Sequence, residues 1–160
     1  MLLCRARRFA VVGTLAVLLG SLVSAAWAQE NLPSLVPKLD PVWQGLARNN
    51  ARFLSKDQQI LLDDLGFAAA AADGCPGFVI DRNAFEQAFK SFRTDEYMKL
   101  SPELKRKFEY HLMMNFGATR ALYAAEGYLN PGPSCRLAES RREAGPGRFW
   151  VPPASAAPAQ

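Results

Sequence analysis

The chain has 160 residues, 49% of them hydrophobic, with 19 lysines and arginines, 15 acidic residues and a single histidine. Most of the formal charge of +4 belongs to the start of the chain, where Arg5, Arg7 and Arg8 precede an apolar run. Without residues 1–28, sixteen basic side chains balance fifteen acidic ones. A chain so close to neutral gives no reason to expect a nucleic-acid or anionic-membrane partner.

Residues 1–28 have the three-part layout of a secretory signal peptide: a basic start, an apolar run over 9–23, and small residues at Ala26 and Ala28. The apolar run is shorter than the roughly 20 residues that a membrane-spanning helix needs. We therefore predict cleavage after Ala28 and a periplasmic or secreted protein with no integral membrane span; an uncleaved anchor is the alternative. The remaining length suits a single domain with one modest core.

Cys75 and Cys135 remain after the predicted cleavage, and an even pair in an exported protein is most simply a disulfide. Such a bridge closes a loop of about 60 residues and restricts the unfolded chain by roughly 4 kcal/mol. Two free thiols or half of a metal site are the alternatives. A metal site lacks support, because the chain has one histidine and no CxxC motif.

Proline and glycine divide the chain into three further parts. Pro33 and Pro37 predict that residues 29–40 form an extended N-terminal arm. A helical domain is expected over 41–143. Residues 144–160 are rich in proline, glycine, alanine and serine, which predicts a disordered tail.

The predicted helices combine N-terminal capping residues with apolar residues at helical spacing. Ser55 and Gln58 form a capping box, and Asp81 and Ser101 are further caps. The four main helices are expected at about 41–52, 56–74, 82–93 and 101–127. A short helical turn should follow Thr94, and a short polar helix is expected at 136–143. Between the helix that ends at Gly127 and this short helix, Pro131, Gly132 and Pro133 predict that residues 128–135 are non-helical.

The helix over 101–127 is the predicted centre of an all-α fold, a small bundle of about four helices with one disulfide. Its second half is apolar or small on every side, so we expect that half to be buried, with Met113 and Met114 as core residues. The alanine-rich second helix should approach it closely near Gly117. The phenylalanines of the third helix should be covered by its Leu104, Phe108 and Leu112 face.

A polar stripe on the central helix is the candidate ligand site. His111, Asn115, Thr119 and Glu126 share one face of that helix, and a polar line among apolar residues must find partners. With Asp64 of the second helix, the stripe could hold a small ligand or a metal ion. The alternative is that these groups hydrogen-bond to each other, to the backbone or to water. Asp63, beside Asp64, is interpreted as a solvated residue.

Phe149 and Trp150 stand out in the predicted tail as a docking motif for a partner or for a groove of the protein itself. No nucleophile elbow, P-loop or dinucleotide-binding glycine pattern is present, and neighbouring carboxylates on one helix diverge. The sequence therefore predicts an exported, non-enzymatic module without a cofactor, which binds an envelope protein or a small ligand. A ligand or metal carrier using the polar stripe is the alternative. The third and least favoured hypothesis is an enzyme in which His111 meets a carboxylate or thiol from another helix.

Overall fold

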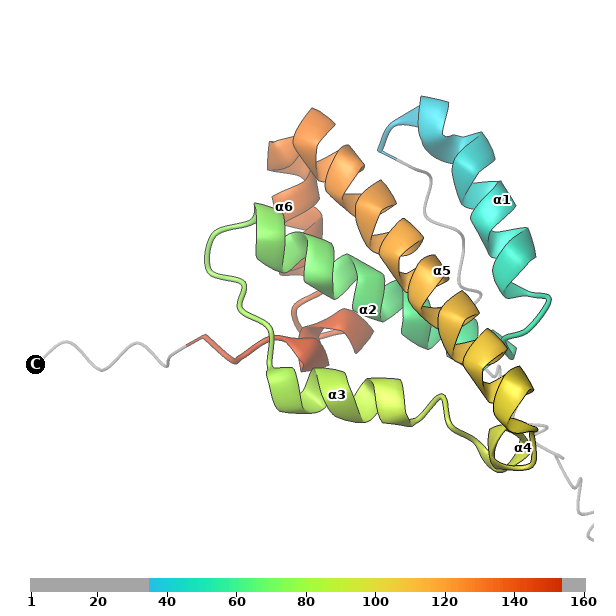
Figure 1. Cartoon of the computed structure of the whole chain (residues 1–160). Coiled ribbons are helices and arrows are strands. Elements are labelled where there is room, and N and C mark those ends of the chain that lie inside the picture. The colour runs from blue at the N-terminus through green and yellow to red at the C-terminus, as the bar shows by residue number, and fades with distance from the viewer. Residues whose placement is uncertain (1–34, 154–160) are drawn as a thin grey trace, which may run out of the picture. The chain divides into compact units, whose positions relative to one another are not determined.

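The computed structural model describes residues 35–153, which contain six α-helices, two short 3-10 helices and no strand beyond an isolated bridge (Figure 1). The α-helices are α1 (Asp40–Asn50), α2 (Lys56–Gly74), α3 (Arg82–Lys90), α4 (Asp95–Met98), α5 (Pro102–Leu129) and α6 (Pro131–Ser140). The 3-10 helices are η1 (Pro37–Leu39) and η2 (Gly145–Phe149). The all-α prediction is confirmed. The predicted signal peptide lies outside the described residues, as does most of the predicted arm. The described end of the arm is not extended as predicted, because it contains η1 and the first residue of α1.

Side-chain caps start four of the helices at the predicted residues. Ser55 accepts a hydrogen bond from the backbone N–H of Gln58, whose own side chain accepts from the Ser55 N–H at 3.0 Å. Asp81, Thr94 and Ser101 cap α3, α4 and α5 in the same way, each through the third residue that follows. These caps satisfy N–H groups that have no partner within their helices.

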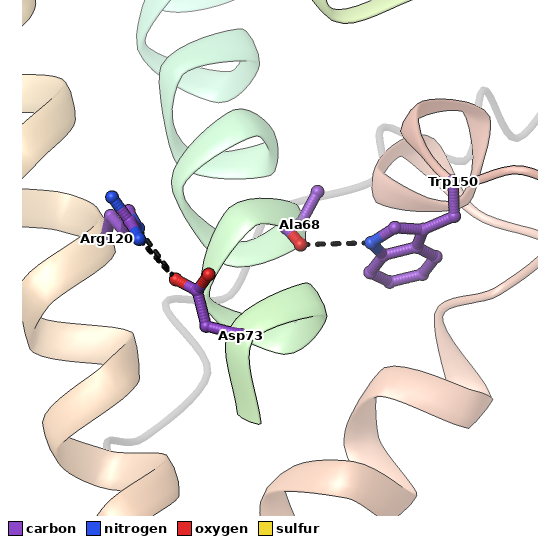
Figure 2. A network of polar contacts seen from close by, with 4 residues as sticks. All are labelled: Ala68, Asp73, Arg120 and Trp150. Atoms are coloured by element: carbon purple, nitrogen blue, oxygen red, sulfur yellow. Dashed lines mark hydrogen bonds and ion pairs between the residues drawn. The ribbon is translucent and has the colours of Figure 1, made fainter. Parts of the chain in front are cut away.

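The core lies around α2, where Leu62 and Leu65 are completely buried. Figure 2 shows α2 between α5, which carries Arg120, and the C-terminal segment, which carries Trp150. The crossing of α2 and α5 is closest at Gly66 and Thr119, where a Cβ atom on Gly66 would lie 2.5 Å from Thr119 Cγ2. The predicted close approach of α2 to the stretch around Gly117, Ala118 and Ala121 forms within that stretch, but through Thr119, because Gly117 itself faces open space.

The phenylalanine side of α3 meets a different surface from the predicted one. The rings of Phe85 and Phe89 have their centroids 6.0 and 5.1 Å from that of Phe116, and Phe85 also lies 5.9 Å from Phe149. Leu104, which was expected to cover this face, is exposed. Phe149 of the C-terminal segment therefore supplies part of the cover that we expected from the start of α5.

Helix α6 contradicts the prediction that residues around Pro131 and Pro133 are non-helical. Pro131 is its first residue, and both prolines lie in the first turn, where no N–H group has to donate within the helix. Helix α6 places Cys135 beside Cys75 at the end of α2, with the two Cα atoms 5.5 Å apart. The predicted disulfide is confirmed.

The segment after Ala144 is folded as far as the structure describes it, contrary to the predicted disorder from that residue. Trp150 is 3% exposed, and its indole N–H donates to the carbonyl oxygen of Ala68 at 3.0 Å (Figure 2). Two backbone hydrogen bonds of 2.8 Å, from Asp81 N–H to Phe149 O and from Val151 N–H to Val79 O, hold the segment beside the start of α3. Burial of two large aromatic side chains outweighs the composition that suggested disorder. Residues 154–160 lie outside the described part.

Candidate functional site

The polar stripe on α5 is buried against α1 at its centre. Asn115 accepts a hydrogen bond from the Asn49 side chain at 2.8 Å and donates to the carbonyl oxygen of His111 at 2.7 Å. The Thr119 hydroxyl donates to the carbonyl oxygen of Asn115 at 2.8 Å. Both side chains are almost fully buried. The polar groups of Asn115 and Thr119 therefore fasten α1 to α5 or bond to their own helix.

The contact between α1 and α5 continues towards the end of α5. The Trp43 indole N–H donates to Glu126 Oε1 at 2.7 Å, and the Trp43 ring lies 4.6 Å from the ring of Tyr123. Figure 1 shows α1 running alongside α5. A buried carboxylate is costly unless it accepts hydrogen bonds, and Trp43 supplies one here. The stripe thus has a structural use at both Asn115 and Glu126.

His111 and Asp64, the strongest candidate donor residues, have different surroundings. The His111 ring is half-buried, with its centroid 5.6 Å from that of Phe53. Asp64 lies on α2 next to η2, where its Oδ2 is 3.7 Å from Nη2 of Arg148. No cluster of three or more histidine, cysteine or acidic side chains suited to a metal ion occurs among residues 35–153. The structure does not join Asp64 to the stripe.

Asp63, which was predicted to be solvated, is partly buried and hydrogen-bonded. The Tyr123 hydroxyl donates to its carboxylate, with both oxygens 2.9 Å away. Burial raises the pKa of Asp63 although this hydrogen bond lowers it, and burial also raises the pKa of Tyr123 well above its ordinary value. This pair is a polar contact within the α2–α5 interface, and no pattern in the sequence predicts that Tyr123 lies opposite Asp63.

A groove that we call the α2–α3 groove runs between α2, α3 and η2, with a volume of about 720 Å³. Its polar lining consists of Asp57 and Asp64 from α2, Ser91 at the end of α3, and Arg148 from η2. Its apolar lining includes Ile60, Leu61, Ala84, Ala88 and Phe149. A neighbouring cavity of about 600 Å³ shares Asp57 and adds Glu96 and an aromatic floor. Burial, followed by the charge of Asp63, raises the pKa of Asp64 to about 6.

The second half of α5 is not covered on every side as predicted. Tyr110 and Tyr128 are 63% and 87% exposed, and Met113 and Met114 are more than half exposed. We define the α5 exposed face as the residues between Tyr110 and Tyr128 that lie within about 40° of one line along the helix; towards the start of α5 this line continues to the charged residues Arg106 and Glu103. The residues of this face are all exposed, and they are Tyr110, Met114, Gly117, Ala121, Ala124 and Tyr128.

Phe149 and Trp150, the predicted docking motif, are both buried in the protein's own core. The Trp150 ring lies 4.6 Å from that of Phe78 and 6.2 Å from that of Phe67. Neither side chain is presented to a partner, and self-docking describes where they lie.

Comparison of the chain with protein-family models, curated proteins and solved structures finds no match. Within residues 35–153, no helix is both long enough and apolar enough to cross a membrane.

Proposed function

We propose that this protein is an exported, non-enzymatic helical module that binds a protein partner through the α5 exposed face. One observation carries the proposal: five turns of α5 expose a line of apolar and small side chains between Tyr110 and Tyr128. No charged residue belongs to this line between the two tyrosines, and Arg120 lies about 80° to one side of it. Contiguous apolar surface of this kind marks interaction sites on monomeric proteins.

The shape of the face suits another helix. Gly117, Ala121 and Ala124 are small, so a second backbone can approach the middle of α5 closely. Tyr110 and Met114 at one end and Tyr128 at the other offer larger apolar groups where crossing helices diverge. A partner helix that places small residues at the crossing point is the expected occupant.

The non-enzymatic part of the proposal is supported by how the stripe is used. The side chains of Asn115 and Thr119 bond to the Asn49 side chain and to backbone carbonyl oxygens of α5, so their polar atoms are not arranged around an open cavity. Export is supported by the layout of residues 1–28 and by the disulfide, which is typical of oxidising compartments. A mass spectrum of the secreted protein tests the predicted cleavage after Ala28.

Capture experiments with envelope extract test the partner proposal. Ala121→Glu places a charge at the centre of the α5 exposed face and should abolish capture of the partner. Val79→Glu is the matched control, because Val79 is an exposed apolar residue on a loop outside this face and its variant should retain the partner. Equal capture by both variants, with both folded by circular dichroism, would contradict the proposal. Light scattering shows whether the partner is a second copy.

A small-ligand carrier is the second candidate function. The polar stripe does not support it, but the α2–α3 groove does, because its half-buried carboxylate lies beside an apolar lining.

A further inference from the structure

Two carboxylates of the α2–α3 groove lie along one side of α2. Asp57 and Asp64 are seven residues apart, which places them on the same helix face at a separation of about 10 Å along the axis. Ile60 and Leu61 line the groove between them. The side of the groove that α2 forms therefore has a carboxylate at each end and an apolar stretch in the middle.

Asp64 lacks a full set of polar partners in this groove. Its side chain is 13% exposed, and it accepts no hydrogen bond from any residue in the described part of the chain. Its ion pair with Arg148 is 3.7 Å long, which exceeds the distance of a charge-assisted hydrogen bond. Arg141 also acts electrostatically on Asp64, but no ion pair within 4 Å joins them. A carboxylate that has lost most of its water and whose one close ion pair has this length has unused capacity for a cationic donor.

The charges of the groove select the kind of ligand. Among the described residues that line it, Asp57 and Asp64 outnumber the cation Arg148, and the neighbouring cavity adds Glu96 and no cation. An anionic ligand would face this acidic side, whereas a cation would complement it. The apolar stretch between the carboxylates favours a ligand whose charges are joined by methylene groups.

We propose that the α2–α3 groove binds a linear aliphatic diamine or polyamine. One terminal ammonium group lies at Asp64, the other lies at Asp57, and the connecting methylene chain covers Ile60 and Leu61. Arg148 competes for Asp64, so its guanidinium must move aside when the ligand binds. This site is separate from the α5 exposed face and does not depend on the partner proposed for it.

Calorimetric titration of the purified protein with diaminooctane and spermidine tests the proposal at about pH 7.5, where Asp64 is ionised. Octylamine, which has the same chain but one ammonium group, should bind roughly tenfold more weakly. Asp64→Asn and Asp57→Asn should each weaken diaminooctane binding by about tenfold. Asp73→Asn is the matched control, because Asp73 pairs with Arg120 outside the groove and its loss changes the net charge equally.

Arg148→Ala tests whether Arg148 competes for Asp64, and Arg120→Ala, which removes the same charge outside the groove, is the control for general attraction between charges. Removal of a competing cation should tighten diaminooctane binding by roughly two- to fivefold. The proposal is overturned if octylamine binds as tightly as diaminooctane, or if Asp73→Asn weakens binding as much as Asp64→Asn. Failure to detect binding of either diamine by the folded protein at millimolar concentration would also overturn it, and it would leave the α5 proposal untouched.

Discussion

Gly66 and Gly117 lie inside helices, and changing each of them to alanine should shift stability in opposite directions. Gly117 lies on the exposed side of α5, and a Cβ atom there would meet nothing within 4 Å. Gly66 lies where α2 crosses α5, and its Cβ atom would approach Thr119 Cγ2 at 2.5 Å, Thr119 Cβ at 2.9 Å and the Arg120 backbone nitrogen at 3.2 Å. The same chemical change therefore tests whether this crossing is as close as the structure shows.

The magnitudes follow from two opposing effects. Alanine is better than glycine inside a helix by about 0.5–1 kcal/mol, and Gly117→Ala should gain this amount. Gly66→Ala gains the same amount but overpacks a filled site, which typically costs about 1–3 kcal/mol. The upper end applies because Thr119 Cβ and the Arg120 nitrogen belong to the α5 framework and cannot turn away. We expect Gly66→Ala to destabilise the protein by about 2 kcal/mol.

Urea unfolding monitored by circular dichroism measures both free energies of unfolding. In a domain of this size 1 kcal/mol corresponds to roughly 3–5 °C, so the melting temperatures of the two variants should differ by about 10 °C. Thr119→Ser removes the nearest carbon and should restore part of the loss in the Gly66→Ala background, which a double-mutant cycle detects as coupling. If Gly66→Ala stabilises the protein as much as Gly117→Ala does, the close crossing of α2 and α5 is wrong.

Three further variants test other parts of the fold. Trp150→Ala should lower the free energy of unfolding by about 3–5 kcal/mol, whereas Val151→Ala should change it little because Val151 is exposed. Equal urea midpoints for the two variants would show that this segment is not packed in the core. Replacing Cys75 and Cys135 by serine should cost up to about 4 kcal/mol in thermal unfolding, and alkylation of both thiols without reduction would disprove the bridge. Asp64→Asn should stabilise the protein by about 1–2 kcal/mol at about pH 8 and by little at about pH 4, because burial raises the pKa of Asp64 to about 6.

The sign for Asp64 follows from proton binding. A folded protein in which the pKa of Asp64 is raised binds more protons than the unfolded chain between about pH 4 and pH 6, so stability falls as the pH rises through that range. Asp63 adds to this rise, while Arg148 and Arg141 reduce it. Solvent access to the groove lowers the expected effect below the full value of the shift. A flat difference between wild type and Asp64→Asn across this range would contradict the assignment.

The helix starts were predictable from sequence because capping depends on a few adjacent residues. Ser55, Asp81, Thr94 and Ser101 each bond to the third residue that follows, so no information about the rest of the fold is needed. The disulfide was predictable because only two cysteines remain beyond the predicted signal peptide. Proline at the first position of α6 was misread, because the same residue that ends a helix is also suited to begin one.

The partners of the candidate site residues depend on packing between distant elements, which sequence patterns do not contain. The pattern placed Asn115 and Thr119 on one helix face, but Asn49 of α1 comes from 66 residues away. Trp150 donates a hydrogen bond to Ala68, which lies 82 residues earlier in the chain. The proline, glycine, alanine and serine residues around Trp150 predicted disorder instead. The exposed face of α5 has the composition of a buried face, so only the structure could show that residues 35–153 leave it uncovered.

The two tryptophans of the described part lie at separate interfaces, so the fluorescence of each can report on a different part of the fold. Trp43 lies between α1 and α5 beside Glu126, while Trp150 lies among the rings of Phe67 and Phe78 on the other side of α2. In a chain without residues 1–28, and therefore without Trp27, replacing either indole by phenylalanine leaves the fluorescence of the other to report on its own interface. Coincident emission changes during denaturation would show that α1 and the C-terminal segment detach in one cooperative event. Separate transitions would show which of these two elements detaches first.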